Sequence, residues 1–322
     1  MNFLPNLMRT IWSNNDRKRD KSNTVPDNLT IHKDITYAPS SSDKESFFHL
    51  TDIYRPSVSN DLLPVIVSVH GGGWFYGDKE LYRFYCMHLA TKGFVVVNFN
   101  YRLAPEYKYP AAIADVCLLM DFIRQNHEKY GMDLDSLFMV GDSAGAQLTT
   151  QYNILATNKD YGELCTKAFS FCPHLLAGTF KDSTDSFKMA ALLSRLPIPK
   201  AIALNCGIYD MNEIRKQHIC KWYLPKQMES LLDTSFFHML DYMTSDFPPA
   251  YLMLSVNDDL KIHTASMKAR LEKLGIPFRY KEFGEGHPED GHVFHINLQS
   301  QNGLLCNSEE CAYFHSQISP ID

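Results

Sequence analysis

Two short motifs in this sequence combine residue types that can carry out acyl transfer. The first spans residues 141–145, reads Gly-Asp-Ser-Ala-Gly and fits the pattern G-x-S-x-G, which places a serine on a sharp turn between a strand and a helix. An apolar run at 136–140 precedes this motif, and a helix-like run at 144–148 follows it. This context predicts that Ser143 is a nucleophile held at a strained turn.

The second motif is a glycine run at residues 70–74, His-Gly-Gly-Gly-Trp, which directly follows the apolar, β-branched stretch 64–69. Because glycine has no side chain, its backbone N–H can approach a substrate oxygen closely. We therefore expect an oxyanion hole whose donors come from this loop and from the residue after the serine. The candidate donors are Gly71, Gly72, Gly73 and Ala144.

The neighbours of the glycine run argue against a nucleotide site. A phosphate-binding P-loop would need Gly-Lys followed by Ser or Thr at a fixed spacing after Gly72, where this sequence has Gly-Asp-Lys at 77–79. A dinucleotide-binding fingerprint that began at Gly71 would need a glycine where Tyr76 stands. The glycine run is therefore better explained by the oxyanion hole.

A serine hydroxyl is a weak nucleophile at neutral pH, so it needs a nearby base, and that base needs a carboxylate to fix its tautomer. Such groups gather at the carboxyl ends of the strands in a parallel sheet. Asp258 and Asp259 directly follow the strand-like segment 251–256. Neighbouring loop side chains point apart, so only one of the two should reach the base. We expect that residue to be Asp258.

Three histidines follow the last strand-like segment, 278–283, and are the candidates for the base. They come after the aspartates, which gives the chain order serine, acid, histidine, one of the orders that Ser–His–Asp sites use. We expect His292 to be the base in preference to His287, with His295 as a third choice. The histidines that are not the base are interpreted as solvated or hydrogen-bonded loop residues.

Strand-like and helix-like segments alternate along most of the chain. This pattern predicts a mostly parallel sheet of about eight strands with helices on both faces. The expected strands are 29–37, 46–54, 64–69, 94–99, 136–140, 201–206, 251–256 and 278–283, of which the first two should pair antiparallel. The expected helices are 2–13, 79–92, 111–130, one that begins after Ser143, 262–274 and a C-terminal helix from Ser308.

We expect one domain over residues 1–322, with a helical cap over the site. Segment 207–247 is rich in aromatic residues and methionine and has no strand pattern, so we interpret it as a lid that lines a substrate pocket. The N-terminal segment, approximately 1–25, would complete the cap. Residues 165–199 fit no regular pattern and are interpreted as an insertion over one end of the sheet.

The composition limits the partners of the protein. The 322 residues carry a formal net charge of −6, so no basic excess indicates nucleic-acid binding. The 8 cysteines include no C-x-x-C pair, which gives no zinc-like spacing and indicates a reducing compartment. No apolar run reaches the ~18 residues of a membrane span, and the N-terminus lacks the pattern of a signal peptide. We expect a cytoplasmic protein, and a homo-oligomer remains compatible with the sequence.

Three stretches in combination resemble the hormone-sensitive-lipase-like esterases, the H-G-G-G branch of the α/β-hydrolases. They are residues 70–74, the Tyr-Arg-Leu-Ala-Pro-Glu segment at 101–106, and Gly-Asp-Ser-Ala-Gly-Ala at 141–146. The resemblance extends from about Leu62 to Phe294. It implies an α/β-hydrolase fold with a cap, and carboxylic-ester hydrolysis through an acyl-enzyme without a metal or an organic cofactor.

The resemblance also assigns roles residue by residue. Ser143 matches the nucleophile of the family, and Asp258 matches the acid, although Asp259 stands where the family usually has proline. His292 matches the base, through the His-Val-Phe sequence at 292–294. The long stretch 165–199 departs from the family pattern. Residues 205–210 resemble acetyl-esterase-like members, which makes polar substrate alcohols a reasonable expectation.

The function expected from these observations is hydrolysis of short-chain acyl esters by a serine carboxylesterase that acts on small molecules. Two other readings remain. An amidase or peptidase would use the same serine, histidine and aspartate, so the sequence discriminates poorly between ester and amide substrates. A catalytically silent, hydrolase-like binding protein typically lacks one of the three residues, whereas this chain has a candidate for each.

Overall fold

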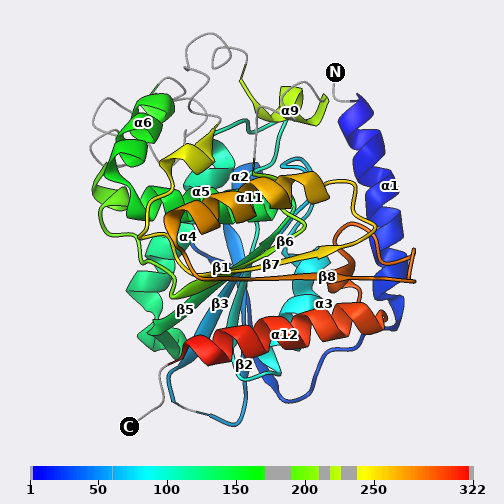
Figure 1. Ribbon diagram of the computed structural model, residues 1–322. Helices are drawn as coiled ribbons and strands as arrows, with labels where there is room; N and C mark the ends of the chain where they lie inside the picture. The colour runs from blue at the N-terminus through cyan, green and yellow to red at the C-terminus, as the bar shows by residue number, and fades with distance from the viewer. Residues whose placement is uncertain (1–2, 60, 171–189, 210–217, 226–237, 319–322) are drawn as a thin grey trace.

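The fold is built on one twisted sheet (Figure 1). The computed structural model describes residues 3–59, 61–170, 190–209, 218–225 and 238–318. Within these residues eight strands form the sheet in the order β1-β2-β4-β3-β5-β6-β7-β8. The strands are β1 (Leu29–Thr36), β2 (Leu50–Pro56), β3 (Leu63–Val69), β4 (Val95–Phe99), β5 (Met132–Asp142), β6 (Ala201–Asn205), β7 (Ala250–Ser255) and β8 (Phe278–Phe283).

The register agrees with the predicted sheet. Strand β2 pairs antiparallel with both β1 and β4, and every pair from β4 through β3 to β8 is parallel. The central strands are buried on both faces, which explains why they are continuous apolar runs rather than alternating ones. Their carboxyl ends therefore lie at one edge of the sheet, where the loops that follow β3, β5, β7 and β8 can meet.

Helices cover both faces of the sheet (Figure 1). Helices α3 (Lys79–Ala90) and α12 (Gln301–Gln317) pack on one face, and α4 (Ala111–Asn126), α5 (Ala144–Thr157) and α11 (Lys261–Leu274) pack on the other. The remaining described helices are α1 (Phe3–Arg19), η1 (Asp20–Ser22), α2 (Asp43–Ser46), η2 (Phe47–His49), η3 (Glu128–Tyr130), α6 (Lys159–Ser170), α9 (His218–Tyr223), η6 (Met239–Tyr242) and η7 (Phe294–Ile296). None of the described helices is long and apolar enough to cross a membrane.

Several predicted elements have different bounds in the structure, and β5 is one of them because it spans Met132–Asp142 rather than 136–140. The second strand was expected from residue 46 but begins at Leu50, because the Ser42 side chain caps a helical turn by accepting from the Glu45 N–H. The predicted 111–130 helix stops at Asn126 and gives way to the short helix η3. The C-terminal helix begins at Gln301 rather than Ser308, since Ser300 is its N-cap and accepts from the Gly303 N–H.

The N-terminal helix is also longer than predicted. It was expected to end near residue 13, but α1 continues to Arg19. The Arg19 guanidinium pairs with Asp16 at 3.0 Å and with Asp20 at 2.8 Å, and it donates to the carbonyl oxygen of Leu81 at 3.1 Å. These contacts fix the last turn of α1 on the domain.

Parts of the expected cap and insertion lie outside the described residues. Positions 171–189 of the 165–199 segment, and 210–217 and 226–237 of the 207–247 segment, are not described. Within the described part, helices α9 and η6 belong to the expected lid. Figure 1 shows α1 along one side of the domain and α9 beside its N-terminal end.

Candidate functional site

The turn between β5 and α5 holds Ser143 in a strained backbone conformation, with φ of 52° and ψ of −118°. The flanking glycines are required by close packing. A Cβ on Gly145 would lie 2.0 Å from the carbonyl oxygen of Val69, and one on Gly141 would lie 2.5 Å from the carbonyl oxygen of Gly145. The backbone N–H of Ser143 donates to the Asn205 carbonyl oxygen at 3.0 Å, which ties the turn to the end of β6.

Ser143, His292 and Asp258 form a continuous hydrogen-bonded chain. The Ser143 Oγ lies 2.9 Å from His292 Nε2, and His292 Nδ1 lies 2.9 Å from Asp258 Oδ2. Asp258 is buried and its other oxygen accepts from the Leu260 N–H. Burial alone would raise the pKa of Asp258, but the hydrogen bond and charge of His292 hold that pKa below its ordinary value. The acid is therefore ionised at neutral pH.

The other candidate residues lie elsewhere. Asp259 is exposed, as expected for a side chain that points away from its neighbour. His287 is also exposed and its Nδ1 lies 3.0 Å from the Glu289 carboxylate. His295 is buried against the Tyr85 ring, and burial lowers the pKa of His295 to about 3, so its ring stays neutral.

The glycine loop after β3 borders the serine. Gly72 has a φ of +108°, and a Cβ there would lie 2.1 Å from the Tyr76 carbonyl oxygen, so only glycine fits. Gly72 and Gly73 line the same pocket as Ser143. The N–H of Gly71 instead donates to the Tyr82 hydroxyl oxygen at 3.0 Å. Gly71 therefore differs from the other three expected donors, because its N–H is already engaged inside the protein.

Aromatic contacts fix the position of this loop. The His70 ring stacks on Tyr101 at 4.0 Å between centroids, and the Tyr101 hydroxyl donates to the His70 carbonyl oxygen at 2.8 Å. Burial lowers the pKa of His70 to about 4, so the ring is neutral and donates from Nδ1 to the Gly71 carbonyl oxygen. The Trp74 indole N–H donates to Gln147 on α5 at 3.0 Å. His70 thus contacts its own loop rather than Ser143.

A buried ion cluster holds the 101–106 segment, which carries Tyr101. The Arg102 guanidinium contacts Asp115 at 2.6 Å and Glu45 at 3.0 Å, and all three side chains are buried. These charges satisfy one another, as burial of ionised groups requires. The segment also contacts α1, because Arg9 donates to the Ala104 carbonyl oxygen and pairs with Glu106 at 2.8 Å.

Two buried carboxyl groups, those of Asp142 and Glu310, lie behind the serine turn. Asp142 Oδ2 accepts from the Tyr82 hydroxyl at 2.7 Å. Glu310 on α12 accepts from the Tyr85 hydroxyl at 2.8 Å and from the side-chain amide of Asn205 at 3.1 Å. The Asn205 backbone holds the Ser143 N–H, so Glu310 supports the turn from the opposite face of the sheet. The sequence signal for Glu310 was its place on the apolar face of the C-terminal helix. This signal was missed because the helix was predicted to begin at Ser308 rather than at Gln301.

These two carboxyl groups predict a pH-dependent stability. Burial raises the pKa of both Asp142 and Glu310 to about 7, from 3.8 and 4.5. Between those ordinary values and about 7, the unfolded chain ionises while the folded protein keeps the protons, so the folded state binds more protons. The free energy of unfolding should therefore fall as pH rises through that range. Urea denaturation across this pH range should show a smaller fall in the free energy of unfolding for Glu310→Gln than for the wild type. The same dependence on pH in both proteins would contradict the prediction.

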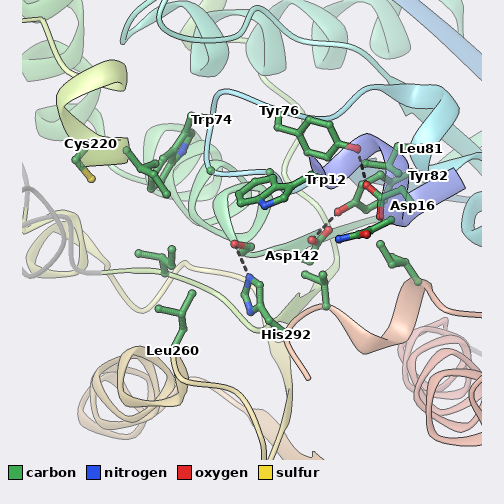
Figure 2. Close-up of a pocket in the computed structure, with 18 residues that line it drawn as sticks. Trp12, Asp16, Trp74, Tyr76, Leu81, Tyr82, Asp142, Cys220, Leu260 and His292 are labelled. Carbon is green, nitrogen blue, oxygen red and sulfur yellow. Dashed lines mark hydrogen bonds between the residues drawn. The ribbon is translucent and has the colours of Figure 1, made fainter. Parts of the chain in front are cut away.

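The site opens into a cavity of about 470 Å³ that α1 helps to form. Figure 2 shows Trp12 and Asp16 of α1 facing this cavity, together with His292 and Trp74. The Trp12 ring packs against Phe75 and Tyr76 of the loop that follows the glycine run, at 5.1 and 5.4 Å. The α1 helix therefore forms part of the cavity wall.

Two groups of side chains have the spacing of a metal site within the described residues. Cys206, Asp258 and His292 have potential ligand atoms within 4.8 Å of one another, as do His287, Glu289 and Asp290. Asp258 and His292 in the first group are hydrogen-bonded to each other and to the serine. The second group is mostly exposed, so neither group supports a metal-site proposal.

Comparison with known proteins identifies the family. Residues 51–266 match the family model described as BD-FAE. The chain belongs to the BD-FAE family. The BD-FAE match contains Ser143, the glycine loop and Asp258, and it ends before His292.

Individual relatives match parts of the chain. An alpha/beta hydrolase of Acanthamoeba polyphaga mimivirus is 26% identical over 226 residues, which cover 70% of this chain and 60% of that protein. Carboxylesterase NlhH of Mycobacterium tuberculosis is 38% identical over 105 residues, which cover 31% of this chain and 33% of that protein. The chain thus matches less than two thirds of the length of either relative.

Solved structures extend the comparison to the whole fold. Esterase B from Lactobacillus rhamnosis, in a form inhibited by a tributyrin phosphonate, has a TM-score of 0.75 at 20% identity and covers 97% of this chain and 94% of its own. The predicted α/β-hydrolase fold is therefore confirmed. The resemblance of this BD-FAE member to the hormone-sensitive-lipase-like esterases is confirmed as well.

Proposed function

We propose that the protein is a carboxylic ester hydrolase in which Ser143 is the nucleophile, His292 the general base and Asp258 the residue that orients His292. The carrying observation is the hydrogen-bonded chain from Ser143 Oγ through both ring nitrogens of His292 to the Asp258 carboxylate, with 2.9 Å at each step. This is the arrangement that activates a serine hydroxyl. Membership of the BD-FAE family and the match to a segment of carboxylesterase NlhH support the proposal that the bond cleaved is an ester.

The reaction proceeds in two steps. His292 Nε2 takes the proton of Ser143 Oγ as this oxygen attacks the ester carbonyl carbon. The tetrahedral intermediate collapses, its bond to the alcohol oxygen breaks, and His292 returns the proton to the departing alcohol. A water molecule then attacks the acyl-enzyme in the same way, with His292 again as base, and releases the acid.

The oxyanion hole is formed by the N–H groups of Gly72, Gly73 and Ala144. Gly72 and Gly73 line the cavity beside Ser143, and Ala144 begins the helix that follows it. Gly71 is left out of this set because its N–H already donates a hydrogen bond to the Tyr82 hydroxyl oxygen. Each donor directed at the developing negative oxygen is worth roughly 10²–10³ in kcat. We further propose that the whole chain forms one domain, with α1 as part of its cap.

The proposed acyl group is short, because the cavity of about 470 Å³ must hold the alcohol as well as the acyl chain. Hydrolysis of p-nitrophenyl esters from acetate to decanoate tests this directly. We expect kcat/KM to be highest for the short chains and to fall toward decanoate. Matched p-nitroanilides are the control for amide chemistry, and faster turnover of the anilides would replace the esterase proposal with an amidase.

A further inference from the structure

The cavity extends from the serine in two directions that differ in chemistry. Figure 2 shows Trp74, Cys220 and Leu260 on one side of His292, with Tyr76, Leu81, Tyr82 and Asp16 on the other. We call the first side the apolar arm, formed by Trp74, Ile219, Cys220 and Leu260. We call the second side the polar arm, formed by Asn15, Asp16, Tyr76, Leu81 and Tyr82.

The two arms differ in their access to solvent. In the apolar arm, Trp74 is 1% exposed and Cys220 is 0% exposed, while Ile219 and Leu260 are partly exposed. In the polar arm, Asn15 is exposed and the side chain of Asp16 is 23% exposed. In the two-step reaction the acyl group stays bonded to Ser143 while the alcohol leaves and water enters. The arm lined by apolar side chains therefore suits the acyl chain, and the arm that carries exposed polar side chains suits the alcohol.

The polar arm has free hydrogen-bonding capacity. Asp16 accepts from the Tyr76 hydroxyl at 2.5 Å and from Arg19 at 3.0 Å, which leaves lone pairs on a carboxylate that has about four acceptor sites. The side chain of Asn15 is exposed and lines the cavity, and its amide can both donate and accept. Arg19 pairs with both Asp16 and Asp20, so the arm carries no excess positive charge and disfavours anionic alcohols.

We propose that helix α1 recognises the alcohol of the ester, through Asn15 and Asp16, and that this alcohol carries further free hydroxyl groups. The preferred substrates are then short-chain monoesters of small neutral polyols. This inference rests on the proposed esterase function and adds the substrate class to it. It also gives the N-terminal helix a role in specificity in addition to covering the site.

A matched pair of substrates tests the alcohol preference. Glycerol 1-butyrate and propyl butyrate share the acyl group and the carbon chain of the alcohol, and differ by two hydroxyl groups. We expect the wild type to have a higher kcat/KM for the glycerol ester. In Asn15→Ala the ratio of the two kcat/KM values should fall about 10-fold, because a site built to bond hydroxyl groups loses a partner. Asn14→Ala, an exposed neighbour on α1 outside this cavity, is the control and should keep the wild-type ratio.

A second variant tests the assignment of the arms. Leu260 lies in the apolar arm and is partly exposed, so a larger side chain has room to be accommodated. Leu260→Trp should lower kcat/KM for octanoate relative to acetate and leave the glycerol-to-propyl ratio unchanged. The inverse result, a changed acyl profile in Asn15→Ala and a changed alcohol ratio in Leu260→Trp, would overturn the assignment. Equal wild-type turnover of the two butyrates would overturn the polyol preference, whereas failure to hydrolyse any ester would instead contradict the proposed function.

Discussion

Ser143→Ala should lower kcat for short-chain esters by roughly 10⁶-fold, the loss expected when a serine hydrolase loses its nucleophile. Without Oγ there is no acyl-enzyme, and only the oxyanion hole and substrate binding remain to stabilise the transition state. The measurement is the initial rate of p-nitrophenyl acetate hydrolysis by wild type and variant at the same protein concentration. A fluorophosphonate probe should label the wild type and leave the variant unlabelled.

The fold of this variant should be close to that of the wild type. The Ser143 hydroxyl is hydrogen-bonded to His292, and the positive φ of 52° burdens alanine no more than serine. Thermal unfolding is the control for this point. Retained turnover in a folded Ser143→Ala protein would contradict the assignment of the nucleophile, and labelling of the variant would place the reactive group elsewhere.

Asp258→Asn should lower kcat by about 10⁴-fold and leave KM nearly unchanged. The amide cannot hold His292 in the tautomer that accepts the serine proton, and it cannot stabilise the imidazolium that forms during the reaction. The neighbouring Asp259 provides a matched control, since it has the same side chain one position further along the loop and is exposed. Asp259→Asn should therefore have kcat and KM close to those of the wild type.

Kinetics with a single ester give both parameters for each variant. An equal loss of kcat in the two variants would show that the loss comes from a disturbed loop and not from removal of the carboxylate that bonds His292. A loss of kcat confined to Asp259→Asn would instead assign the orientation of His292 to Asp259. The wild-type geometry favours Asp258, because its Oδ2 lies 2.9 Å from His292 Nδ1.

The core of the sheet could be predicted because its signals are local. Parallel strands buried on both faces must be continuous apolar runs, and the runs at 64–69, 94–99, 201–206 and 251–256 show this directly. The boundaries that were wrong depended on caps and on distant partners. Arg19 extends α1 because it bonds to Leu81, 62 positions further along the chain, and no periodicity in residues 1–25 contains that information.

The residues of the candidate site also divide into those that local motifs predicted and those that depend on distant partners. Motif spacing and chain order led to Ser143, Asp258 and His292, and these three side chains are in hydrogen-bond contact in the structure. Gly71 was grouped with the oxyanion donors because it belongs to the glycine run, but its N–H donates a hydrogen bond to the Tyr82 hydroxyl oxygen. Glu310 was not considered, since its partner Asn205 lies 105 positions away.

By itself, the sequence determined the placement of four features: a serine at a strained turn, a glycine loop after a parallel strand, and an acid and a histidine at the ends of later strands. These features follow from backbone conformation and strand order, which short segments encode. The tertiary structure decided that the Gly71 N–H is already engaged, that burial raises the pKa of Asp142, and that α1 forms one wall of the cavity. Those properties depend on desolvation and on side chains brought together from distant parts of the chain, so they exist only once the chain has folded.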